Sequence, residues 1–115
     1  MNKEKAVFLC YLDDIDDPGA KGFSVETAGR RLELFVVRQD NHIYGYQNQC
    51  PHTGVCLDWQ PDAFLSEAQT HIVCSMHGAL FRMDDGFCVA GPCRGDTLTP
   101  VDTAVIDKSI YLLQS

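Results

Sequence analysis

The sequence has 115 residues, of which 16 are Asp or Glu and 9 are Lys or Arg, giving a formal net charge of −7. A chain of this length predicts one domain, residues 1–115, which can bury a hydrophobic core without needing disulfide bonds or a structural metal for stability. The acidic balance argues against nucleic-acid binding, which needs a basic face, and against binding to an anionic membrane surface. It suits transient docking on a basic partner, although acidic chains are also simply soluble.

The N-terminal region contains a short apolar run, residues 6–12, between Lys5 and Asp13. This run is too short, and too quickly followed by acidic residues, for a secretion signal or a membrane span. We therefore expect no membrane association and a cytoplasmic location.

The patterning predicts an all-β fold. The segment 31–39 shows a period of two, interrupted by consecutive apolar residues, and Asp40-Asn41 makes the turn to a hairpin partner. Residues 13–19 are expected to form an acidic turn, and 57–70 an irregular excursion anchored by Trp59, Phe64 and Leu65. Strands are predicted over residues 6–12, 22–27, 31–39, 42–47, 71–74, 79–83, 97–106 and 109–113.

Two short motifs give the strongest chemical signal. Cys50-Pro51-His52 is followed, after twenty-one intervening residues, by Cys74-Ser75-Met76-His77. One thiolate and one imidazole on each of two loops suit a cluster in which one iron takes two sulfurs and the other takes two nitrogens, the ligation of a Rieske [2Fe–2S] centre. Gly54 and Gly78 follow the motifs and permit positive φ and close backbone approach to a cluster.

These loops resemble those of the Rieske family. Residues 50–54 and 74–78 look like its two ligand loops, and Gly91-Pro92 looks like its proline loop; the resemblance runs from about residue 32 to the C-terminus. It implies stacked antiparallel sheets with a small cluster-binding subdomain, roughly residues 48–95, and one cluster per chain. Cys50 and Cys74 would bind the inner iron, and His52 and His77 the outer iron.

The same resemblance implies a function. A Rieske-type ferredoxin is a soluble one-electron carrier that passes electrons from a flavoprotein reductase to an oxygenase or similar acceptor. It has no catalytic residues of its own, and the sequence shows neither a G-x-G-x-x-G motif nor a nucleophile elbow. Two alternatives are a small Rieske-like subunit of an assimilatory nitrite reductase and a cluster-based redox or iron sensor.

Zinc is the competing metal. Two Cys and two His form tetrahedral zinc sites in many small proteins. Zinc-finger spacing normally keeps the two Cys together and the two His together, whereas each motif here mixes them. A single zinc ion held by one Cys and one His from each loop remains the alternative.

The other cysteines, Cys10, Cys56, Cys88 and Cys93, are interpreted as small buried apolar residues. In respiratory Rieske proteins a disulfide joins the ligand loops, but its second-loop position here is Met76, so Cys56 has no equivalent partner. Cys88–Cys93 and Cys56–Cys93 disulfides are the alternatives.

The residues after the second ligand loop predict a low reduction potential. Respiratory Rieske proteins carry a serine and a tyrosine at the positions of Ala79 and Phe81, and those hydroxyls donate hydrogen bonds to cluster sulfurs. Neither residue here can donate from its side chain. The other two histidines, His42 and His71, are expected to be ordinary surface or strand residues.

Overall fold

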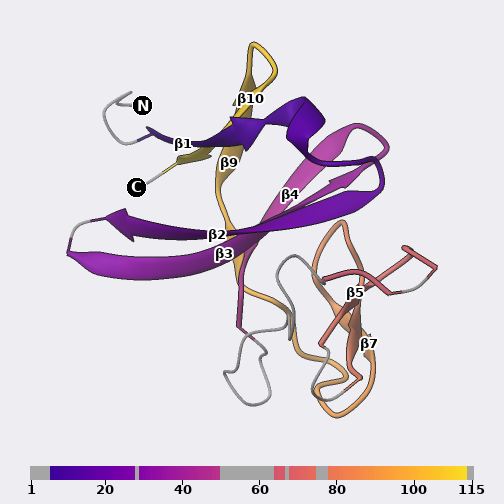
Figure 1. Cartoon of the computed structure of the whole chain (residues 1–115). Coiled ribbons are helices and arrows are strands. Elements are labelled where there is room, and N and C mark those ends of the chain that lie inside the picture. Colours follow the sequence, from indigo (N-terminus) through magenta and orange to yellow (C-terminus); the bar gives the residue numbers. More distant parts are fainter. Residues whose placement is uncertain (1–5, 28, 50–63, 67, 75–77, 114–115) are drawn as a thin grey trace.

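A computed structural model describes residues 6–27, 29–49, 64–66, 68–74 and 78–113. The described chain forms three antiparallel sheets and no α-helix, which confirms the all-β prediction (Figure 1). One sheet has the order β1-β10-β9, formed by Ala6–Tyr11, Ser109–Leu113 and Thr103–Ile106. The second has the order β2-β3-β4-β8, formed by Gly19–Thr27, Arg30–Gln39, His42–Gln47 and Pro100–Val101. The third has the order β5-β6-β7, formed by Ile72–Val73, Leu80–Phe81 and Cys88–Ala90.

Two tight turns lie where the sequence predicts them. Asp40 and Asn41 have φ values of 51° and 63°, and Gln39 pairs with His42 across the β3–β4 hairpin. The turn between β9 and β10, at 107–108, has the same pair of φ values. Two consecutive residues with positive φ form a turn whose twist matches that of the flanking strands, and Asn and Asp tolerate this conformation.

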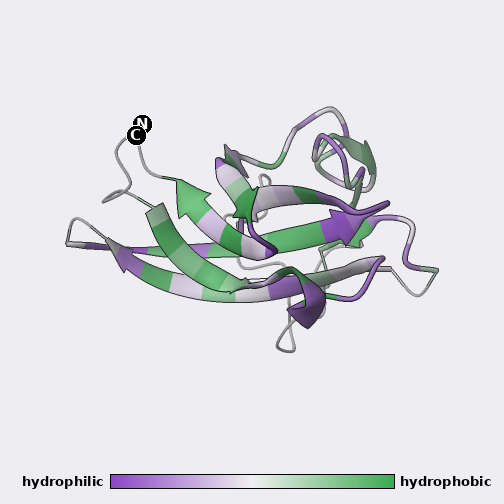
Figure 2. Ribbon diagram, turned by 90° about the horizontal axis from the view of Figure 1, so that it is seen from above, coloured by the Kyte–Doolittle hydropathy of each residue, from purple (hydrophilic) through white to green (hydrophobic). Residues whose placement is uncertain are grey.

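Strand β3 is buried on both faces. Four consecutive residues, Leu34, Phe35, Val36 and Val37, are completely inaccessible to solvent. Leu34 and Val36 belong to the core between the first two sheets, whereas Phe35 and Val37 belong to the core that reaches the third sheet. The consecutive apolar residues that interrupt the alternation are thus explained by a strand with a core on either side. Figure 2 shows long hydrophobic stretches along the strands, with hydrophilic segments mostly near their ends.

The core next to the third sheet is built around aromatic rings. Phe35 of β3 stacks on Phe64, with ring centroids 4.4 Å apart and an interplanar angle of 11°. Phe64 is fully buried and Leu65 packs against the same core, so both act as the anchors predicted for the long excursion. Trp59, the third predicted anchor, lies outside the described residues.

Several boundaries differ from the predicted ones. The strand predicted over 97–106 is two strands, because β8 pairs with β4 while β9 pairs with β10. Strand β7 was not predicted; its three residues complete the third sheet beside β6. The acidic turn begins with a single 3₁₀ turn, η2 (Leu12–Asp14), and ends at Gly19, where β2 begins.

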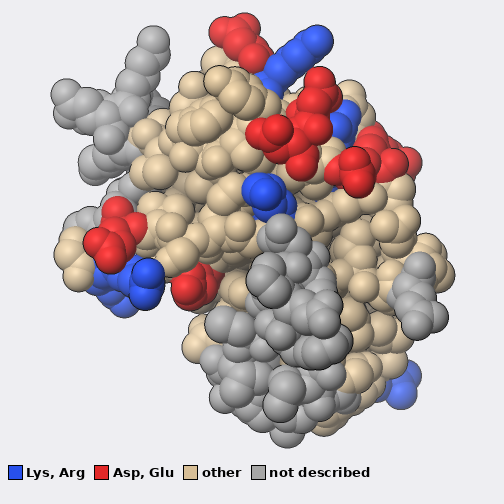
Figure 3. Space-filling model, in the orientation of Figure 1, with Lys and Arg blue, Asp and Glu red and all other residues tan. Residues whose placement is uncertain are grey.

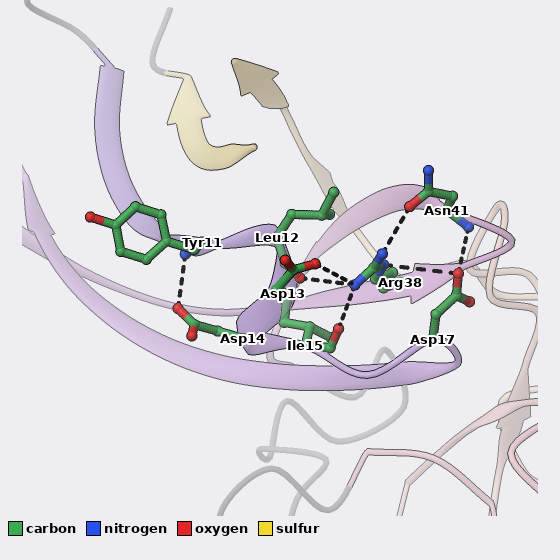
Figure 4. A network of polar contacts seen from close by, with 8 residues as sticks. All are labelled: Tyr11, Leu12, Asp13, Asp14, Ile15, Asp17, Arg38 and Asn41. Carbon is green, nitrogen blue, oxygen red and sulfur yellow. Dashed lines mark hydrogen bonds and ion pairs between the residues drawn. The ribbon is translucent and has the colours of Figure 1, made fainter. Parts of the chain in front are cut away.

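The acidic turn is fastened to the β3–β4 hairpin by Arg38 (Figure 4). One guanidinium nitrogen donates to the carbonyl oxygens of Leu12, at 3.1 Å, and Ile15, at 2.9 Å. The other terminal nitrogen donates to the side-chain oxygen of Asn41 at 2.9 Å. The Arg38 side chain is only 15% exposed, so its bonds to the two carbonyls are partly shielded from water and hold η2 against the sheet.

Asp17 completes the same junction. Its carboxylate accepts the backbone N–H groups of Asp40 and Asn41 at 2.9 Å and 2.8 Å, and lies 3.9 Å from the Arg38 guanidinium. A carboxylate that accepts two main-chain donors fixes the position of the hairpin turn relative to the start of β2. The acidic cluster therefore has a structural role in addition to its charge.

We expect Arg38→Ala to lower the free energy of unfolding by roughly 2–4 kcal/mol, because the carbonyls of Leu12 and Ile15 lose a charged donor. Circular dichroism should show this as a lower thermal midpoint. Arg31→Ala, at an exposed position on the same strand, is the control and should leave the midpoint nearly unchanged. Equal midpoints for the two variants would contradict the anchoring role of Arg38.

Candidate metal centre

Of the four predicted ligands, Cys74 directly follows β5 and is described, whereas Cys50, His52 and His77 lie outside the described residues. The chain approaches Cys50 from β4, where the Asn48 N–H donates to the Glu33 carbonyl at 2.8 Å. Both predicted ligand loops thus begin at the end of a paired strand, which gives each loop a fixed starting point.

Cys74 is fully buried in the core next to the third sheet. Its backbone N–H donates to the Ala79 carbonyl at 2.9 Å, and its carbonyl accepts the Gly78 N–H at 2.8 Å. These two main-chain bonds hold Cys74 beside Gly78 and Ala79, which follow the predicted ligand His77 in the sequence.

Gly78 has a φ of +70°, the left-handed conformation that the sequence predicted for it. A β-carbon at this position would meet no atom within 4 Å, so the conformation rather than crowding favours glycine here.

The segment predicted as a proline loop is a closed hairpin that ends β7. The Cys88 N–H donates to the Asp96 carbonyl at 2.8 Å, and the Gly95 N–H donates to the Cys88 carbonyl at 3.2 Å. Between them, the Arg94 N–H donates to the Gly91 carbonyl at 3.2 Å. Gly91, Pro92, Arg94 and Gly95 are exposed, whereas Cys93 is 1% exposed.

This loop packs directly on the second motif. A β-carbon added to Gly91 would lie 2.7 Å from the Cα of Ala79, closer than such atoms approach in proteins. Only glycine therefore permits the two segments to touch, and its φ of +97° also favours glycine. The contact places the proline loop against Ala79, which follows His77 by two residues in the sequence.

Ala79 and Phe81 are both fully buried beside this contact. Phe81 pairs with Ile72 on one side and Cys88 on the other, in the centre of the third sheet. The positions expected to carry hydroxyl donors in high-potential relatives are thus occupied by apolar side chains within the core.

A contact that the sequence did not reveal joins the second sheet to this region. The Tyr46 hydroxyl of β4 donates to the Met83 carbonyl at 2.7 Å, and both residues are buried. Burial, with the nearby carboxylates of Asp85 and Asp84, raises the pKa of Tyr46. The strand predicted over 42–47 includes Tyr46, but the sequence could not identify a partner 37 positions away.

The remaining histidines and cysteines follow the sequence interpretation in part. His42 is exposed, and His71 is half-buried with its Nδ1 2.9 Å from the Thr70 hydroxyl. Cys10, Cys88 and Cys93 are buried, as expected, while Cys56 lies outside the described residues. The sulfurs of Cys88 and Cys93 are 3.3 Å apart, which is a contact between thiols rather than a disulfide of about 2.05 Å.

The described part of the chain is compatible with a cluster. Cys74 supplies a buried soft sulfur donor, the ligand type that iron–sulfur clusters use, and the absence of a side chain at Gly91 permits the close approach to Ala79. Within the described ranges, no group of three or more His, Cys, Asp or Glu is arranged to hold a metal ion; three of the predicted ligands lie outside those ranges. No helix among the described residues has the length and apolar character needed to cross a membrane.

Comparison with known proteins decides the family. The family model for the Rieske [2Fe-2S] domain matches residues 5–107 of this chain. The chain belongs to the Rieske family. Its cofactor is accordingly the Rieske [2Fe–2S] cluster, and the Rieske resemblance seen in the sequence is confirmed. No curated protein sequence gives a significant match.

Solved structures show the same fold for Rieske ferredoxins. The ferredoxin of carbazole 1,9a-dioxygenase from Nocardioides aromaticivorans IC177 is 22% identical, with a TM-score of 0.72, covering 96% of this chain and 99% of that one. The Sphingomonas yanoikuyae B1 ferredoxin is 23% identical, with a TM-score of 0.71, covering 95% and 98%. A further match is a complex of reduced oxygenase and oxidized ferredoxin in carbazole 1,9a-dioxygenase, at 20% identity, with a TM-score of 0.72, covering 96% and 94%.

Gly91→Ala should disturb the site more than Gly95→Ala. The two glycines have nearly the same φ, +97° and +95°, but only Gly91 contacts Ala79, while a β-carbon at Gly95 meets nothing within 4 Å. The conformational cost of about 1–2 kcal/mol is common to both variants. The steric clash should cost Gly91→Ala a further 1–3 kcal/mol or so.

Thermal unfolding and iron content of the two variants would measure the difference. We expect Gly91→Ala to have the lower midpoint and the lower cluster occupancy. Equal effects would mean that the close contact between the proline loop and the second motif is not required.

Proposed function

We propose that this protein is a one-electron carrier that uses a Rieske [2Fe–2S] cluster to pass electrons from a flavoprotein reductase to an oxygenase or similar enzyme. The main support is that the Rieske family model matches nearly the whole chain, residues 5–107. In addition, the structural match to a ferredoxin of a dioxygenase system covers 96% of this chain and 99% of that ferredoxin. A family match of this extent supports the proposal of a carrier with one domain, 1–115. A cytoplasmic location remains a prediction.

We assign the ligands by their motif positions. Cys50 and Cys74 would bind the inner iron, and His52 and His77 the outer iron. The complete burial of Cys74 supports its place on the inner iron, because a thiolate there is shielded from solvent. The exposure of Gly78, next to His77, supports an outer iron near the surface, where an electron can enter and leave.

The charge distribution supports docking of a partner through the proline loop, away from the carboxylates over η2 and the β9–β10 turn. On the face in Figure 3, carboxylates gather over η2 and the β9–β10 turn. The proline loop instead exposes Pro92 and Arg94. We infer that long-range attraction orients the carrier, while contact near the cluster uses apolar and mixed-charge surface.

The carrier role predicts that the protein accepts an electron from one enzyme and donates it to another. Purified protein should contain about two irons and two acid-labile sulfides per chain and lose visible absorption on reduction. A flavoprotein reductase with NADH should reduce it, and a terminal oxygenase should reoxidise it with stoichiometric transfer of one electron. Full reduction without reoxidation by any Rieske oxygenase would contradict the carrier role, and a colourless protein with one zinc would contradict the cluster.

The ligand assignment predicts that Cys74→Ser mostly prevents cluster assembly, because a hard oxygen is a poor iron–sulfur ligand. Cys10→Ser is a matched control: it changes another buried cysteine, but one that packs in the core between the first two sheets. Iron analysis and the visible spectrum should separate the two variants. Equal iron content in both would overturn the assignment of Cys74.

The buried Ala79 and Phe81 predict a low reduction potential. Donors to the cluster sulfurs would favour the reduced state, and neither side chain can donate. Rieske centres span roughly −150 to +300 mV, and we expect this one near the lower end, with little change in potential near neutral pH. Voltammetry should also show a higher potential for the Ala79→Ser/Phe81→Tyr variant. A wild-type midpoint well above about 0 mV would contradict the low-potential assignment.

A further inference from the structure

Two buried cysteines flank the proline loop and touch each other. The Sγ atoms of Cys88, at the start of β7, and Cys93 are 3.3 Å apart, and the residues are 0% and 1% exposed. The Cys88 thiol also donates to the Ala90 carbonyl at 3.2 Å. The proposed electron transfer uses neither sulfur.

The main chain holds this pair in place. The Cys88 N–H and the Cys93 carbonyl each bond to Asp96, both at 2.8 Å, and the Cys88 carbonyl accepts the Gly95 N–H at 3.2 Å. The sulfurs therefore face each other because the hairpin is closed by backbone bonds. To form a disulfide, the two sulfurs would have to move from 3.3 Å to about 2.05 Å apart.

We propose that Cys88 and Cys93 form a reversible dithiol–disulfide site, oxidised by a peroxide and reopened by a small thiol reductant. One thiolate attacks a peroxide oxygen, the O–O bond breaks, and a sulfenic acid and one water form. The second thiol attacks that sulfur, the S–S bond forms, the S–O bond breaks, and a second water leaves. Two thiols and one hydrogen peroxide thus give one disulfide and two waters.

Access to this site lies through the loop itself. Gly91, Pro92, Arg94 and Gly95 surround Cys93 in sequence and are all exposed, so the loop that contains Cys93 lies at the surface of the protein. Hydrogen peroxide is small enough to enter when the loop opens slightly. A disulfide that forms transiently is also the kind that occurs in reducing compartments.

The disulfide would fasten the loop over the second motif. Cys88 and Cys93 bracket Gly91, whose backbone packs on Ala79. Joining the two cysteines restricts the unfolded chain and should fix this contact. We therefore expect oxidation to raise the thermal midpoint by several degrees. This inference does not depend on the proposed carrier role.

Tryptic mapping of the cluster-loaded protein provides a direct test. Cleavage after Arg82 and Arg94 releases residues 83–94, a peptide that contains Cys88 and Cys93 and no other cysteine. Cys10 lies in the peptide 6–21, and Cys50, Cys56 and Cys74 lie in 39–82. After brief treatment with hydrogen peroxide and alkylation of remaining thiols, peptide 83–94 should carry no alkyl groups and should lack two hydrogen atoms. Prior treatment with dithiothreitol should restore two alkyl groups.

Controls separate this site from general oxidation. Cys88→Ala and Cys93→Ala should abolish the thermal shift, whereas Cys10→Ala, in the other core, should retain it. Oxidation of Met83 in the same peptide shows that peroxide has reached this region. If peptide 83–94 is still doubly alkylated when Met83 is oxidised, the proposal is overturned. It is also overturned if Cys88 and Cys93 are oxidised to sulfinic acid without forming a disulfide. Should a variant fail to fold, the wild-type peptide still decides the outcome.

Discussion

The burial of β3 on both faces is the constraint on which the rest of the structure depends. Leu34 and Val36 face the core below β1 and β10, and Phe35 and Val37 face the core that contains Phe64 and Cys74. A shift of one residue in the pairing of β3 would exchange these two sets, placing each against the wrong core. The position of the metal centre is therefore set by the register of a strand that contributes none of its predicted ligands.

The described part of the metal centre is held mainly by backbone. Main-chain bonds join Cys74 to Gly78 and Ala79 and close the hairpin from Cys88 to Asp96, and Gly91 of that hairpin packs on Ala79. Among the described residues, side-chain contacts to the larger sheet include the stack of Phe35 on Phe64 and the bond from Tyr46 to Met83. Backbone closure suits a redox centre because it limits how far the loops can move when the cluster charge changes.

Local signals in the sequence predicted the features that depend on few residues. The hairpin turns, the buried Phe64 and the positive φ of Gly78 each follow from the chemistry of one or two positions. Pairings between distant segments were not predictable in the same way: β1 with β10, the division of 97–106, and the short strand β7. These depend on which sheet edge a segment reaches, and neither periodicity nor composition contains that information. The ligand set follows from motif spacing and remains a prediction for Cys50, His52 and His77.

The pairing of β1 with β10 has a consequence for how the molecule could be attached to something else. Ala6 lies opposite Leu113, so the first and last described strands run side by side, and Figure 1 places them at the opposite end of the molecule from β5 and β7. A tether, an electrode surface or a fused domain connected near either of these residues would lie behind the protein. The proline loop would then still point outward, open to whatever approaches it.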